Sequence, residues 1–281
     1  TDLLIVGCYK GNSSGKIIQI LDQASHGAIK KITKRGDHKG LIGTSLSIPT
    51  LQGVKSERVN ILGCGERTKV KSLEQAIKII SNAVQSAKSS GSKDAYIILP
   101  RIKLNNQNDQ WLSYQIGLIA ESSCYSYTPK LGKSTNNLTK LKKITVIFTE
   151  SKNNINDLKK ELLKGQITGQ GVNVAKELGN LPGNICTPSH LAKESKAASK
   201  KYNNLSCKVL GEKEMSKLGL DCLLSVGEGS AQESKLICLE YKGSLKSKKP
   251  FVLVGKGITF DTGGISLKPG NAMDEMKYDM C

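Results

Sequence analysis

The sequence contains few aromatic residues and few histidines, and it has no long apolar run. Aromatic residues make up 4% of the 281 residues, with one tryptophan and three histidines. No segment approaches the roughly 18 consecutive apolar residues that a membrane-spanning helix needs. The opening residues, TDLLIVGCYKG, are typical of a strand and turn rather than of a secretion signal. We therefore expect a cytoplasmic protein with no membrane partner.

Cysteine and histidine do not occur at the spacings that mark metal or redox sites. None of the eight cysteines forms a C-x-x-C pair, and several lie inside apolar segments such as DCLLSVG and LICLEY. His26, His38 and His190 are scattered along the chain. We expect free, mostly buried thiols. Each histidine is expected to be structural or solvated.

Several nucleotide-binding and hydrolase motifs are also excluded. In GNSSGKI (11–17), three residues separate the glycines where a phosphate loop needs four, and Ile17 stands where Ser or Thr should follow the lysine. A hairpin or turn is the better interpretation. There is no H-E-x-x-H helix. The chain is therefore not expected to be a phosphate-loop NTPase.

The net charge is +18, and most of it lies in the first part of the chain. Residues 1–164 hold 26 lysines and arginines against 12 acidic residues. A basic region of this kind can attract DNA through counterion release. It can equally be a solvated lysine-rich surface, which the scarcity of aromatic residues for base stacking favours. DNA binding by an accessory or regulatory protein is kept as the alternative function.

The first half alternates strand-like and helix-like segments, as α/β layer domains do. Short apolar, β-branched runs predict strands over 2–7, 58–65, 95–100 and 143–150. A helix is expected after the capping-box pair Ser72 and Gln75, and a second over 109–122. The first of these should bury one face, made of Leu73, Ala76, Ile77, Ile80, Ala83, Val84 and Ala87.

The pattern divides the chain into an N-terminal α/β domain (1–150), a connecting helix (151–179) and a second α/β region (180–281). The Asn- and Lys-rich stretch 130–143 is expected to be an exposed loop. Gly165, Gly169 and Gly171 either permit close packing of the connecting helix or mark a bend.

In the second region, Ser189 is a candidate helix cap. A strand over 207–211 and a short helix over 212–219 should follow. The apolar runs KLICLEYKG and PFVLVGKG are typical of central strands covered on both faces.

The stretch VGKGITFDTGGISLKP (254–269) places Lys256, Asp261 and Lys268 where the last of these strands should end. Ligands collect at the carboxyl ends of strands in open α/β sheets. Carboxylates there suit paired divalent metals, whereas a lysine amine binds metal only when it is neutral. Lys268 could stay protonated and stabilise an oxyanion. The alternative is that both lysines are surface residues and that Asp261 only forms a turn.

This segment, continued as GNAMDEMKYDMC, closely resembles the signature of the leucyl aminopeptidase family of two-metal cytosol aminopeptidases. NLPGNICTPSHLA, RGDHKG and ERVNILGCG resemble other parts of the same family. The resemblance implies an N-terminal α/β domain and a zinc-peptidase-like catalytic domain, assembled into a homo-hexamer. It also implies release of N-terminal residues, typically leucine, from peptides with two Zn²⁺ or Mn²⁺ ions.

Carried over residue by residue, the resemblance gives each part of the signature a role. Lys256 and Asp279 would ligate the tighter metal, and Asp261 would bridge both metals. Lys268 would be the catalytic lysine, binding and polarising the scissile carbonyl. Met276 would line the pocket for the first side chain of the substrate. The acidic residues at 274 and 275 receive no ligand role.

The sequence departs from the family in one respect. The family's N-T-D-A-E-G-R motif, which supplies a further Asp, a bridging Glu and an Arg that holds bicarbonate, does not occur in these 281 residues. We therefore expect a truncated form that alone binds metal weakly and hydrolyses little. A catalytically silent assembly module is a third possibility.

Overall fold

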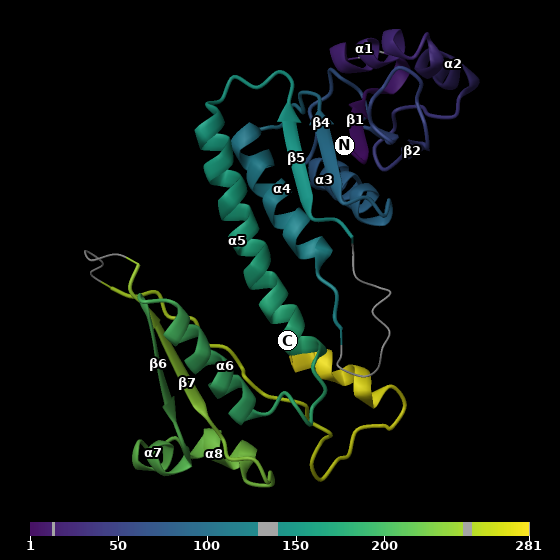
Figure 1. Cartoon of the computed structure of the whole chain (residues 1–281). Coiled ribbons are helices and arrows are strands. Elements are labelled where there is room, and N and C mark those ends of the chain that lie inside the picture. Colours follow the sequence, from purple (N-terminus) through teal and green to yellow (C-terminus); the bar gives the residue numbers. More distant parts are fainter. Residues whose placement is uncertain (13–14, 129–139, 244–248, 281) are drawn as a thin grey trace. The chain divides into compact units, whose positions relative to one another are not determined.

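A computed structural model of the chain describes residues 1–12, 15–128, 140–243 and 249–280. It divides into two compact units, Thr1–Val174 and Ala175–Cys281, which are described separately (Figure 1). Both units combine helices with strands, which confirms the expected α/β class. Residues 130–139 of the exposed loop expected over 130–143 lie outside the described residues, and the last residue of that range, Lys143, already belongs to a strand. No helix in the described ranges is both long and apolar enough to cross a membrane.

The first unit is built on a five-stranded sheet with the order β2-β3-β1-β4-β5. The central strand β1 pairs in parallel with β3 and β4, β5 is parallel to β4, and β2 is antiparallel to β3. Four of these strands were expected from the sequence, and β2 was not. Their bounds are β1 Leu3–Cys8, β2 Ser45–Ile48, β3 Arg58–Gly63, β4 Asp94–Leu99 and β5 Lys143–Phe148.

Helices cover both faces of this sheet, and each face has its own apolar core. One core packs Ile5 and Leu62 of the sheet against α3 and α4, and the other packs Val6 and Ile61 with α1 and α2. Because both faces are covered, the central strand β1, LLIVGC, is apolar along its whole length. The helices are α1 Lys16–Ala24, α2 Ala28–Arg35, α3 Leu73–Ser89 and α4 Asp109–Cys124. The turn expected over 11–17 is wrong at its end, because α1 begins at Lys16.

Helix α3 begins as expected and buries a shifted face. Ser72 Oγ accepts the Gln75 backbone N–H at 3.2 Å, and the Gln75 side chain accepts the Ser72 N–H, so the predicted capping box is confirmed. Leu73 and Ile77, expected in the core, are exposed, and Ile79 is fully buried in their place. Helix α3 contacts the sheet with the face that carries Ile79, Ile80 and Ala83, so the first turn of α3 lies at the edge of the core.

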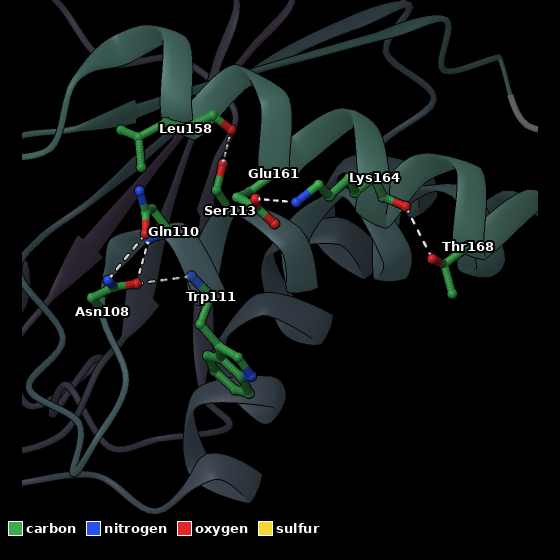
Figure 2. Close-up of polar contacts among 8 residues, drawn as sticks. All are labelled: Asn108, Gln110, Trp111, Ser113, Leu158, Glu161, Lys164 and Thr168. Carbon is green, nitrogen blue, oxygen red and sulfur yellow. Dashed lines mark hydrogen bonds and ion pairs between the residues drawn. The ribbon is translucent and has the colours of Figure 1, made fainter. Parts of the chain in front are cut away.

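Helices α4 and α5 (Ile155–Asn180) pack so closely that their contact requires glycine. A Cβ on Gly165 would lie 1.9 Å from Tyr114 O, and one on Gly117 would lie 2.2 Å from Leu162 O. Ser113 Oγ donates to Leu158 O at 2.7 Å across the same contact (Figure 2). Gly165 and Gly169 therefore permit close packing, whereas a Cβ on Gly171 would meet open space, and α5 runs as one helix through all three glycines.

His38 is buried in the loop that precedes β2 and holds that loop by hydrogen bonds. The Gly40 N–H donates to His38 Nδ1 at 3.3 Å, so the ring hydrogen lies on Nε2, which is 3.3 Å from Thr44 Oγ1. Thr44 Oγ1 in turn donates to Leu41 O at 2.7 Å. Burial lowers the pKa of His38, and the contact with Thr44 opposes that shift. His38 is therefore structural, which is one of the two roles, structural or solvated, that were expected for the histidines.

The second unit has a small sheet of two antiparallel strands, β6 and β7, with α6 packed against it. The short helix predicted over 212–219 is confirmed as α7, and α8 was not anticipated. A 3-10 segment, η2, lies near the end of the chain. The bounds are α6 Pro188–Lys201, β6 Leu205–Leu210, α7 Glu212–Lys217, α8 Asp221–Gly227, β7 Leu236–Tyr241 and η2 Met273–Met280.

Three expectations for this unit are wrong. The run KLICLEYKG forms β7, but it is not a central strand covered on both faces, because β7 pairs only with β6 among the described strands and its Leu239 and Tyr241 are exposed. Residues 250–257 do not form a buried central strand, because no described strand pairs with them, and the side chains of Phe251 and Leu253 are fully exposed. The cap of α6 is Thr187 and not Ser189, since Thr187 Oγ1 accepts the His190 N–H at 3.3 Å. Pro188 occupies the first helical position, which places the cap one residue before it.

The seven described cysteines are free, as expected. The expectation that most are buried is wrong, because only Cys8 and Cys64 of these seven are buried, at the ends of β1 and β3. Cys222 and Cys238 are exposed. Cys222 lies on α8 and Cys238 on β7 of the second unit, and neither of these two elements contains a buried residue.

Candidate functional site

The predicted site residues lie in the last part of the second unit, between residues 256 and 279. Lys256 is exposed in the extended, unpaired stretch that follows Val254. Within the described ranges, Lys256 makes no ion pair. The structure therefore shows no contact between Lys256 and Asp261, the other candidate ligand whose side chain is described.

Asp261 and Lys268 are brought together by a tight turn. Gly263 has a φ of 103°, and a Cβ on it would lie 2.3 Å from Ser266 O, so glycine is required there. Gly263 bridges to Leu267, and the Lys268 N–H donates to Thr262 O at 2.9 Å. The Gly-Gly pair therefore folds the chain back so that the residues on either side of the turn meet.

The Asp261 carboxylate is already engaged on both oxygens. Its Oδ1 accepts the Gly263 N–H at 2.8 Å, and its Oδ2 lies 3.8 Å from Lys268 Nζ. The side chains are 46% and 31% exposed, so solvent screens this ion pair. The sequence suggested that Lys268 could stay protonated and stabilise an oxyanion, and in the structure its ammonium lies beside the Asp261 carboxylate.

The 3-10 segment η2 is attached to the end of α5 through one asparagine. Lys277 Nζ donates to Asn180 O at 3.0 Å, and the Tyr278 hydroxyl donates to Asn180 Oδ1 at 2.9 Å. Met276 is half-buried in this segment. Sequence reasoning missed Asn180, because nothing in the sequence relates it to residues almost 100 positions away. The side chain of Asp279 lies outside the described residues.

An apolar cavity of about 240 Å³ lies beside the same part of the chain. Gly257 to Phe260, which connect Lys256 with Asp261, form one wall, and Leu178, Cys186 and Leu191 contribute to the other. Lys277 also reaches it. The residues between the two proposed ligands therefore face apolar side chains, whereas Asp261 itself is half-exposed.

The described residues do not assemble a metal centre. Nowhere in the described ranges do three His, Cys, Asp or Glu side chains come together in a way that could hold a metal ion. Asp261 is the one proposed carboxylate ligand whose side chain is described. Divalent ions of the zinc type need about four donors. The donor set present does not fit a two-metal site by itself.

Comparisons with known proteins cover nearly the whole chain. The profile of the cytosol aminopeptidase family's N-terminal domain matches residues 5–129, and that of the family's catalytic domain matches residues 173–281. A probable cytosol aminopeptidase of Nitrosococcus oceani is 42% identical over the whole chain and 56% of its own length. One from Alkalilimnicola ehrlichii is 37% identical over 99% of the chain and 55% of its own length. The chain spans about half the length of these curated relatives.

Solved structures share the fold at lower identity. The match to the bottromycin maturation enzyme BotP in complex with Mn covers 99% of this chain and 53% of the BotP chain, with a TM-score of 0.71 and 21% identity. The match to a mutant of tomato leucine aminopeptidase covers 88% of this chain and 49% of the tomato chain, with a TM-score of 0.72 and 19% identity. With both domain profiles matched in order along one chain, the protein belongs to the cytosol aminopeptidase family.

Proposed function

We propose that this chain is the first part of a metal-dependent aminopeptidase that releases N-terminal residues, with leucine preferred, from peptides by two-metal hydrolysis. The observation that carries the proposal is the match of the catalytic-domain profile to residues 173–281, which contain the Lys256–Lys268 segment. The relative that is 42% identical is named a probable cytosol aminopeptidase. The chain alone is proposed to be inactive, because its described residues do not complete a metal site.

The metal ligands proposed within the chain are Lys256, Asp261 and Asp279. The turn at Gly263 supports the role of Asp261, because the Gly263 N–H holds Oδ1 of the carboxylate at 2.8 Å while Oδ2 lies 3.8 Å from Lys268 Nζ. Two divalent ions need more negative charge than two carboxylates provide. We propose that the missing donors belong to the part of the relatives that this chain does not span. Manganese is supported by BotP, which was solved in complex with Mn.

Lys268 is the proposed catalytic lysine, and Met276 the proposed lining of the pocket for the first substrate side chain. The turn fixes the backbone of Lys268 through Thr262 O, which leaves its side chain to move between Asp261 and a substrate carbonyl. A fixed ammonium next to a developing oxyanion stabilises it most where water is excluded. Bicarbonate as a proton shuttle, a cytoplasmic location and assembly into a homo-hexamer are further parts of the proposal for the complete enzyme.

The activity of a relative cut to the same length tests this proposal. The Nitrosococcus oceani protein, whole and ending at the position that aligns with Cys281, should be assayed with leucine p-nitroanilide and Mn²⁺. We expect turnover only from the whole protein. Replacing the lysine that aligns with Lys268 by Ala should reduce turnover by about 10²–10³-fold. Robust turnover by the cut form would show that the metal site is complete without the remaining part.

DNA binding stays the alternative, and one feature of the first unit favours it. Lys30, Lys31, Lys34 and Arg35 are all exposed on the eight-residue helix α2, and within the described part of the chain only Arg35 forms an ion pair, with Asp37 at 3.0 Å. Retention of the whole chain on duplex DNA should be measured across a salt series. If DNA is a partner, retention should fall steeply with salt and weaken in a Lys31→Gln, Lys34→Gln variant. Absence of retention at low salt would leave only a solvated surface.

A further inference from the structure

The first unit contains a cavity of about 290 Å³ between helices α1 and α2, which lie side by side (Figure 1). Cys8, the last residue of the central strand β1, also lines the cavity. In open α/β sheets, ligands collect at the carboxyl ends of the strands. All of the lining residues belong to the first unit, whereas the proposed metal and substrate residues belong to the second. The cavity is therefore a separate candidate site.

The buried part of the cavity lining is apolar and uncharged. Ile18 of α1 and Ile29 of α2 are 5% and 3% exposed, and both line the cavity together with Cys8. Cys8 Sγ donates to Tyr9 O at 3.4 Å, and burial raises the pKa of this thiol, so Cys8 carries no charge at neutral pH. Because an ionic group would lose its hydration against these residues, this part of the lining suits a small hydrocarbon group.

The more exposed part of the lining carries two opposite charges that do not neutralise each other. Asp22 of α1 is half-buried and Lys30 of α2 is exposed. Asp22 Oδ1 accepts the Lys30 backbone N–H at 2.8 Å, which holds the carboxylate beside the first turn of α2. Among the described residues, neither the Asp22 carboxylate nor the Lys30 ammonium forms an ion pair. One negative and one positive group are therefore available to a single ligand.

The volume of the cavity limits the ligand to a small molecule. A water molecule occupies about 30 Å³ in the liquid, so the cavity has room for about ten water-sized groups. An amino acid such as leucine has a similar number of non-hydrogen atoms. Pockets for drug-sized ligands begin at about 300 Å³, so a nucleotide or an extended peptide is too large for this cavity.

We propose that this cavity binds a free α-amino acid with an apolar side chain. The Lys30 ammonium binds the carboxylate of the ligand, Asp22 Oδ2 accepts from its amine, and its side chain lies against the two isoleucines. A metal cation would use only the carboxylate, and an inorganic anion only the ammonium, so neither would use the apolar lining. The inference goes beyond the proposed function and does not depend on it, although a free amino acid is also what an aminopeptidase releases.

Binding of L-leucine to this chain, measured by calorimetry without added metal, tests the proposal. We expect one saturable site per chain. Lys30→Gln and Asp22→Asn should each weaken binding at least about tenfold, because each removes the charge from one contact with the ligand. Asn retains an oxygen that can accept the Lys30 N–H, so α2 should stay folded in Asp22→Asn. Lys31→Gln is the matched control, since Lys31 is exposed on the same helix and does not line the cavity.

Two analogues of leucine assign each charge of the ligand to its partner. Leucinamide lacks the carboxylate and 4-methylpentanoate lacks the amine, so both should bind at least about tenfold more weakly than leucine. Lys30→Gln should weaken leucinamide no further, and Asp22→Asn should weaken 4-methylpentanoate no further, because the group that each side chain binds is already absent. An analogue that binds as tightly as leucine, or full additivity of the two changes, would overturn the proposal.

Amide exchange locates the bound leucine. At about ten times its Kd, leucine should slow exchange in α1 and α2 about tenfold, because these helices open only when the cavity is empty. Exchange in α6 should not change, since α6 borders the cavity of the second unit through Leu191. Protection of α6 in place of α1 and α2, or no saturable binding, would overturn the proposal. Neither readout needs metal or peptide hydrolysis, so failure of the proposed function would leave both unchanged.

Discussion

One strand-like apolar run of the first unit is buried, whereas a similar run of the second unit is exposed. In the first unit, LLIVGC is central to a five-stranded sheet, and Leu3 and Ile5 have no exposed surface. In the second unit, FVLV is at least as apolar and lies in solvent. Both runs are strongly apolar. The comparison teaches that an apolar run becomes a buried strand only where neighbouring strands and covering helices are present.

A matched pair of leucine substitutions should give the largest difference between the units. Leu62→Ala removes a fully buried side chain in β3 and should lower the unfolding free energy of the first unit by about 3–4 kcal/mol. Leu253→Ala should change the stability of the second unit by less than about 0.5 kcal/mol. Fluorescence of the single tryptophan, Trp111 in α4, follows urea unfolding of the first unit, and amide exchange of β6 and β7 follows the second. A large loss in Leu253→Ala would mean that this side chain is buried.

The contact of α4 and α5 allows a similar test within one helix. Gly165→Ala should destabilise the first unit by about 3 kcal/mol, because its Cβ would overlap a carbonyl of α4. Gly171→Ala, which meets open space, should stabilise α5 by about 0.5–1 kcal/mol. Trp111 fluorescence in urea measures both variants. Equal effects of the two substitutions would contradict the close packing.

The cap of α6 predicts an effect of about 1 kcal/mol in the second unit. Thr187→Ala removes the oxygen that accepts the His190 N–H and should destabilise α6 by about that amount. Ser189→Ala should have little effect, because Ser189 is already inside the helix. Amide exchange at the first turn of α6 distinguishes them. A larger loss in Ser189→Ala would restore the cap predicted from the sequence.

The smallest expected effect is a pH dependence of the first unit. Burial lowers the pKa of His38 in the folded state, so the unfolded chain takes up its proton at higher pH than the folded chain does. Stability from the neutral ring is therefore present above the ordinary value of 6.5 and is lost as the pH falls below it. Urea unfolding measured at pH 7.5 and at pH 5.5 should show that the unfolding free energy falls less between these two pH values in His38→Gln than in the unchanged protein. His26→Asn is the control, since His26 is exposed and its φ of 54° suits asparagine.

The fold of the first unit could be predicted where the pattern is local. Four strands and the capping box at Ser72 follow from short β-branched runs and a spacing of three residues. Helix α1 was missed although Ile17, Ile18 and Leu21 show helical spacing, because its glycine-rich start was interpreted as a turn. Which face of α3 is buried depends on where the sheet lies, and this is set by distant residues.

The site was less predictable because it depends on partners far along the chain. The turn between Asp261 and Lys268 follows from the Gly-Gly pair, but the sequence could not show that the two charges pair with each other. The attachment of η2 to Asn180 has no local signal. The strand predicted over 250–257 failed for the same reason, since its pairing partner is not among the described strands.

Titration of Mn²⁺ into this chain by calorimetry tests the central claim most directly, with leucine p-nitroanilide turnover followed on the same sample. Because the described residues form no metal centre, we predict weak binding that does not saturate at two ions, with turnover at background. Tight binding of two ions per chain, lost in Asp261→Asn and accompanied by turnover, would contradict the claim that the site is incomplete.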